Sequence, residues 1–113
     1  MKTQNPLKLN KLQLRTLALL QELSRQEDFS IRDPASGEVT IAPLPQAHGD
    51  HVHIGRFVVA ARAASGFNNP SVLSALERKG LARANYPIAV ILTDAGQAYD
   101  TGLSGPSLGL GQD

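Results

Sequence analysis

The chain has 113 residues, of which 42% are apolar and 19% are charged, as expected of one small globular domain. It contains no cysteine, which excludes disulfides and thiolate metal sites, and its longest clean apolar stretch, residues 88–92, is far too short to span a membrane. Because the first residues carry charge and no apolar signal core, we expect a cytoplasmic protein.

The net charge of +1 conceals a strong segregation along the chain. Residues 1–15 hold four basic residues and no acidic one, and residues 55–86 hold five basic residues and one acidic. Residues 16–54 hold two basic and six acidic residues, and residues 87–113 hold three acidic residues and no basic one. Such segregation can steer a polyanion to one face of a protein, although chance can also produce it in so short a chain.

Residues 7–26 have the apolar periodicity of a helix, with Asn5 as its cap and Pro6 at its first position. The expected core stripe consists of leucines: Leu9, Leu12, Leu19, Leu20 and Leu23, with Leu17 at its edge. A second apolar line, formed by Leu7, Leu14 and Ala18, falls on nearly the opposite side. This line predicts another element or a partner packed behind the helix, and scattered exposed leucines are the alternative.

Residues 28–54 are predicted to form a β-hairpin and a loop. Apolar and polar residues alternate over 29–32 and over 38–41, and residues 33–37 have the chemistry of a turn. Pro43 and Pro45 should stop the second strand from continuing as a central strand. Residues 51–54 alternate again, which indicates a short strand leading to Gly55.

The remaining pattern predicts two helices, a strand pair and a last short helix. The second helix is expected over 56–64, and the third over 70–79, capped by Asn69, opened by Pro70 and ended by Gly80. Strands over 81–84 and 88–92 should flank a tip at 85–87, and Thr93 should cap a helix over 94–100. We expect one domain over residues 1–102, with residues 28–54 as an insertion, followed by a disordered Gly- and Ser-rich tail at 103–113.

The third helix has a face suited to reading DNA. With Leu73 and Leu76 directed to the core, a helical wheel turns small and polar residues outward: Ser71, Ser74, Ala75 and Arg78. Small side chains allow close approach to base edges, and an arginine reaches a guanine or a phosphate. Asn68 and Asn69 at the helix start are expected to hold a phosphate, with Arg83 and Tyr86 touching the flanking backbone. An ordinary solvent-exposed helix face is the alternative interpretation.

Residues 71–81, SVLSALERKGL, followed after a short hairpin by residues 92–96, LTDAG, resemble the winged-helix repressors of the MarR type and their PadR-like relatives. The resemblance implies an α+β fold of the winged helix-turn-helix kind, with a three-helix core and a β-hairpin wing. An extra β-hairpin between the first two helices, a short wing tip and a short C-terminal helix distinguish this chain from that pattern. The resemblance also implies a homodimer that binds duplex DNA, with Ser71, Ser74, Ala75 and Arg78 on the base-facing side.

All three histidines fall within six residues, at His48, His51 and His53, with Asp50 between them. In a strand, His51 and His53 project to the same face. Neutral imidazoles with a carboxylate suit Zn²⁺ or Ni²⁺, so we consider a metal site here, with no other cofactor expected. A solvated His-rich turn and a pH-responsive surface are the alternatives.

We do not expect an enzyme, because there is no cysteine, no serine in a nucleophile-elbow context and no phosphate-binding glycine loop. The sequence predicts a DNA-binding transcriptional regulator that reads duplex DNA with the helix at about 70–79. A winged-helix module that binds another protein is the alternative function.

Overall fold

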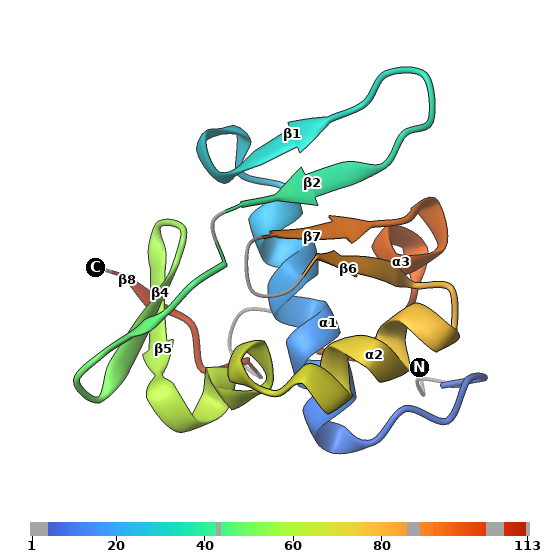
Figure 1. Ribbon diagram of the computed structural model, residues 1–113. Helices are drawn as coiled ribbons and strands as arrows, with labels where there is room; N and C mark the ends of the chain where they lie inside the picture. The colour runs from blue at the N-terminus through green and yellow to red at the C-terminus, as the bar shows by residue number, and fades with distance from the viewer. Residues whose placement is uncertain (1–4, 43, 86–88, 104–107, 113) are drawn as a thin grey trace.

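The computed structural model describes residues 5–42, 44–85, 89–103 and 108–112 (Figure 1). Its helices are α1 (Lys11–Ser24), the 3-10 turns η1 (Glu27–Phe29) and η2 (Ala61–Asn68), α2 (Pro70–Arg78) and α3 (Asp94–Ala98). Its strands are β1 (Ser30–Arg32), β2 (Val39–Ile41), β3 (Ala47–His48), β4 (His51–Ile54), β5 (Phe57–Ala60), β6 (Ala82–Asn85), β7 (Ala89–Leu92) and β8 (Gly111–Gln112). The expected α+β class is confirmed at this level. None of the helices among the described residues has the length and apolar character that crossing a membrane requires.

Helix α1 begins later than the sequence predicted. Asn10 is its cap, in a capping box in which Asn10 and Gln13 each accept a hydrogen bond from the other's backbone amide. The predicted cap, Asn5, instead lies in a turn with a φ of 45°, and its side chain bonds the backbone of Leu9. This capping box satisfies two backbone N–H groups at the start of the helix, those of Asn10 and Gln13. A helix that started at Pro6 would not have this pair of hydrogen bonds.

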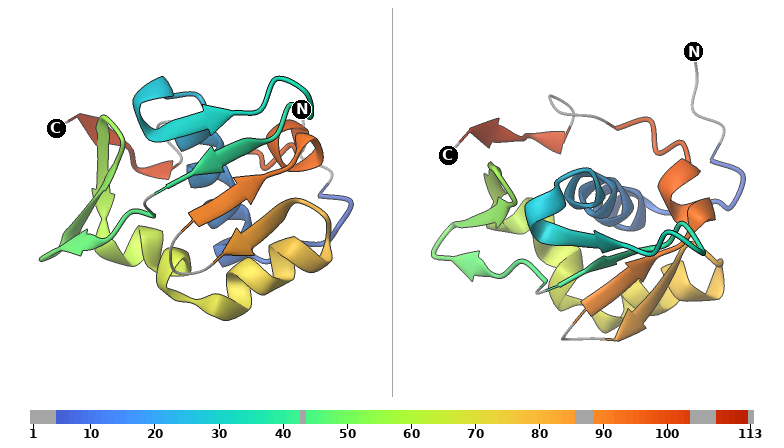
Figure 2. Two further views of the ribbon diagram at one scale, coloured as in Figure 1. Left: turned by 45° about the horizontal axis from the view of Figure 1, so that its top comes forward. Right: turned by 90° about the horizontal axis from the view of Figure 1, so that it is seen from above.

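The second apolar line of α1 is covered by the chain itself. Helix α1 runs through the middle of the molecule, with strands on one side and the C-terminal segment on the other (Figure 2). Ala18 is buried, and Leu7 and Leu14 are half-buried against the core together with Tyr99 and Leu103. The expectation of another element behind this line is therefore confirmed.

The first sheet has the strand order β1-β2-β7-β6 and is antiparallel throughout. The predicted hairpin forms, with Ser30 opposite Ile41 and Arg32 opposite Val39. Strand β2 ends at Ile41 but lies inside the sheet, because its other edge pairs with β7. Through this pairing, the β6–β7 hairpin and the β1–β2 hairpin that follows α1 form one sheet.

A second antiparallel sheet, β3-β4-β5-β8, replaces the start of the predicted second helix. The helix prediction over 56–64 is wrong for residues 57–60, which pair with β4 in a register that places Phe57 opposite Ile54. Gly55 has a φ of 61° at the first position of the two-residue loop, as in type II′ hairpins, and Val58 and Val59 are β-branched. Helical backbone begins only at Ala61, as η2.

The prediction of a disordered tail is wrong for residues 108–112. Leu108 is 4% exposed and belongs to the core, and β8 pairs with Phe57 and Val58 of β5. The prediction rested on the glycine-rich composition of the tail. Burial of the Leu108 side chain and the pairing of β8 with β5 order this segment in spite of that composition. Residues 104–107 and 113 of that tail lie outside the described residues.

Candidate nucleic-acid interface

Helix α2 forms as the sequence predicted. The Asn69 side chain accepts a hydrogen bond from the Ser71 amide at 3.0 Å, Pro70 occupies the first turn, and Gly80 ends the helix region with a φ of 75°. Leu73 and Leu76 are at most 1% exposed and fix the helix on the core. Local signals thus determine both ends of α2, and packing determines its rotation.

The outer face of α2 is open to solvent. Ser71, Ser74 and Arg78 are exposed, and Arg78 makes no ion pair or side-chain hydrogen bond within the described part of the chain. Glu77 shares this face, and its Oε1 accepts a hydrogen bond from the Ala84 amide at 2.9 Å, which ties α2 to β6. Two small hydroxyl side chains and an arginine therefore remain available to a ligand.

Ala75 does not belong to this face. It is 2% exposed, so its predicted position beside a base edge is wrong. Helix α2 packs against α1, η2 and β6, and its buried arc extends round to Ala75. The helical wheel was centred on two leucines, so it could not show how far round the helix the packing of these elements extends.

The asparagines before α2 have different environments. Asn68 is exposed. Asn69 is half-buried, and its side-chain oxygen is used by the cap. The side-chain amide donors of both Asn68 and Asn69 therefore remain for a phosphate oxygen.

At the predicted wing, Arg83 lies in β6 and pairs with Glu38, the residue before β2. Its two terminal nitrogens each donate to one carboxylate oxygen of Glu38 at 2.5 Å. This hydrogen bonding, assisted by the charge of Arg83, lowers the pKa of Glu38. The guanidinium is thus largely neutralised by a neighbour, and Tyr86 lies outside the described residues.

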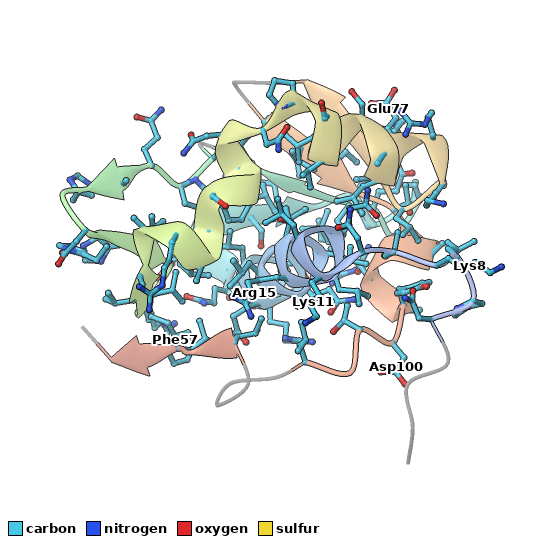
Figure 3. The ribbon with its side chains drawn as sticks, turned by 90° about the horizontal axis from the view of Figure 1, so that it is seen from below. Lys8, Lys11, Arg15, Phe57, Glu77 and Asp100 are labelled. Carbon is cyan, nitrogen blue, oxygen red and sulfur yellow. The ribbon has the colours of Figure 1, made fainter. Side chains whose placement is uncertain are left out.

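A basic hollow of about 250 Å³, which the sequence did not predict, lies between α1 and η2. We call it the basic hollow; Lys11, Arg15 and Arg62 line it together with Leu12. No acidic side chain is among these lining residues, and none of the three cations has an ion pair or side-chain hydrogen bond within the described ranges. Lys11 and Arg15 lie side by side at the near end of α1 (Figure 3).

The residues of the basic hollow come from the two segments of the sequence that are rich in basic residues. Lys11 and Arg15 belong to the basic segment 1–15, and Arg62 belongs to the basic segment 55–86. Nothing in the linear sequence indicates that the two segments meet, because their contact depends on how η2 packs on α1.

The three histidines are brought together on the β3–β4 hairpin. Their ring centroids are 6.2 Å apart for His48 and His51, 5.6 Å for His48 and His53, and 5.1 Å for His51 and His53. Among the side chains that the structure describes, no group of three or more His, Cys, Asp or Glu residues is already arranged to hold a metal ion. This cluster lies in the second sheet and α2 packs on the first, so the two candidate sites are separate.

Known proteins offer no family assignment for this arrangement. No protein-family model matches the chain, and neither the curated proteins nor the solved structures contain a match.

Proposed function

We propose that this protein is a transcriptional regulator that binds duplex DNA, with α2 entering the major groove. The observation that carries the proposal is the outer face of α2, where Ser71 and Ser74 are small and exposed and Arg78 has no partner among the residues that the structure describes. A helix with small outward side chains can approach base edges closely, and an arginine can donate two hydrogen bonds to a guanine.

The order of elements supports a winged-helix interpretation. The helical segments α1, η2 and α2, with the three-residue turn η1 after α1, precede the β6–β7 hairpin, and strand β2 between α1 and η2 pairs with that hairpin. In a winged helix the third helix is the reading helix, and the hairpin is the wing. The Arg83–Glu38 ion pair leaves this wing with little free positive charge, so α2 supplies most of the proposed base contact.

The basic hollow provides the phosphate contacts that the wing lacks. Lys11, Arg15 and Arg62 lie beside η2, the segment that leads directly into α2. Phosphate contacts fix the register of a protein on the duplex and make binding depend on salt. We therefore expect these cations to contribute affinity without sequence preference.

Fluorescence anisotropy with a labelled pool of duplexes tests the proposal. We expect binding at about 50 mM salt that weakens steeply by about 200 mM, because neutralising phosphates releases counterions. Arg78→Ala should cost about 1–3 kcal/mol on a preferred sequence, whereas Arg62→Ala should lower affinity on all sequences and reduce the salt slope by about 1.

The matched control is Arg56→Ala. Arg56 is exposed in the β4–β5 turn of the second sheet and should leave duplex affinity unchanged. The absence of duplex binding at about 50 mM salt, or equal losses for Arg56→Ala and Arg62→Ala, would contradict the proposal.

A protein-binding module is the second candidate function, and one surface favours it. Strand β1 is an edge of the first sheet, Ile31 on it is 75% exposed, and the adjacent Phe29 is 37% exposed. Unpaired strand edges with apolar side chains pair readily with another chain. Sedimentation of the wild type and of Ile31→Lys tests whether a second copy is that partner. A homodimer that dissociates in the variant is expected, and a monomeric wild type would contradict a homodimer through β1.

A further inference from the structure

The β3–β4 hairpin places three imidazoles on one surface. His48 lies directly opposite His51 in the strand register, and His53 follows two residues after His51 on the same face of β4. Gly49, with a φ of 66°, is one of the two residues between the paired strands. The tight turn therefore converts a spacing of three residues into a cross-strand contact.

Two of the three ring separations are close to those of ligands that share one metal ion. Zn²⁺ binds an imidazole nitrogen at about 2.0–2.1 Å, so the ring centroid lies about 3.2 Å from the metal. Two such rings at a tetrahedral angle have centroids about 5 Å apart. The observed separations of 5.1 and 5.6 Å are close to this value, and only the 6.2 Å separation of His48 and His51 must shorten by about 1 Å.

We propose that His48, His51 and His53 form a site for a divalent transition-metal ion, Zn²⁺ or Ni²⁺. Because no group among the described side chains is already arranged to hold a metal ion, metal binding requires the rings to turn. His48 is exposed and the His51 side chain is 42% exposed, so these rings have room to turn. Imidazole ligands favour these metals over Mg²⁺ and Ca²⁺, which prefer oxygen ligands.

Asp50 is placed to support the site. Its Oδ1 lies 3.5 Å from Nδ1 of His51, and its side chain is fully exposed. A carboxylate in this position orients the imidazole and leaves the other ring nitrogen for the metal. The bound ion would link β3, an edge strand of only two residues, to β4.

Isothermal titration of the tag-free full-length chain with ZnSO₄ and NiSO₄ tests this proposal. We expect one ion per chain, at least a tenfold loss of affinity in each of His48→Gln, His51→Gln and His53→Gln, and no binding of MgCl₂. Circular dichroism without metal checks that each variant is folded. The site is refuted if the wild type does not bind either metal at 1 mM, or if the triple His→Gln variant binds as the wild type does.

A second measurement needs no variant. Long-range nitrogen NMR of the wild-type imidazoles should show all three rings shifting together, with saturation at one equivalent of Zn²⁺. A shift confined to one ring would exclude a shared site. The metal proposal is independent of duplex binding, since its readouts contain no DNA.

Discussion

The contact between α1 and η2 is tight at Gly66, and Gly66→Ala tests it. A Cβ at residue 66 would lie 1.9 Å from Oγ1 of Thr16 and 3.1 Å from its Cβ. Thr16 is 1% exposed, and its hydroxyl donates to the Leu12 carbonyl at 2.8 Å, so it cannot turn away freely. The substitution therefore forces α1 and η2 apart.

The size of the effect follows from two opposing contributions. Replacing glycine by alanine in a helical segment stabilises by about 0.5–1 kcal/mol, because the unfolded chain loses freedom. Overpacking a tight contact costs about 1–3 kcal/mol. We expect Gly66→Ala to lower the free energy of unfolding by about 1–2 kcal/mol, measured by urea denaturation. Ser65→Ala, at the exposed neighbouring position, should change it by less than about 0.5 kcal/mol.

A double variant identifies the cause of that loss. Thr16→Ala removes Oγ1 and Cγ2, which are two of the three atoms nearest to the new Cβ. The pair Thr16→Ala and Gly66→Ala should then be less destabilising than the sum of the single variants by at least about 1 kcal/mol. Additive losses, or a Gly66→Ala protein as stable as the wild type, would refute the packing argument.

Two further predictions concern the tail and the wing. Leu108→Ala should cost about 2–4 kcal/mol of unfolding free energy in urea, because Leu108 is a core residue, whereas a disordered tail would show no change. Arg83→Gln should return the lowered pKa of Glu38 toward its ordinary value, as followed by carboxyl NMR. Because the folded-state pKa of Glu38 is depressed, the ion pair stabilises the fold above the ordinary glutamate pKa, and this contribution disappears as the pH falls through the lowered pKa. An unchanged Glu38 titration in Arg83→Gln would exclude this coupling.

Elements with strong local signals were predictable from the sequence. Asn69, Pro70 and Gly80 mark both ends of α2, and the structure places that helix over Pro70–Arg78. Thr93 caps α3 by accepting a hydrogen bond from the Gly96 amide. In each case the signal and the atoms it governs lie within a few residues of each other.

Features that depend on distant contacts were not predictable. Residues 57–60 are apolar without alternation, so periodicity did not separate a buried strand from a helix, and pairing with β4 decided the outcome. The burial of Ala75 depends on the tertiary packing of α2, and the basic hollow depends on η2 lying against α1. The site is therefore partly local, on α2, and partly tertiary.

Backbone NMR of the labelled protein during titration with duplex DNA tests the central claim most directly. If α2 enters the major groove, the largest amide shifts will occur at Ser71, Ser74 and Arg78, with weaker and salt-sensitive shifts around the basic hollow. Shifts confined to β1 or to the β3–β4 hairpin, or no shifts at about 50 mM salt, would contradict the account.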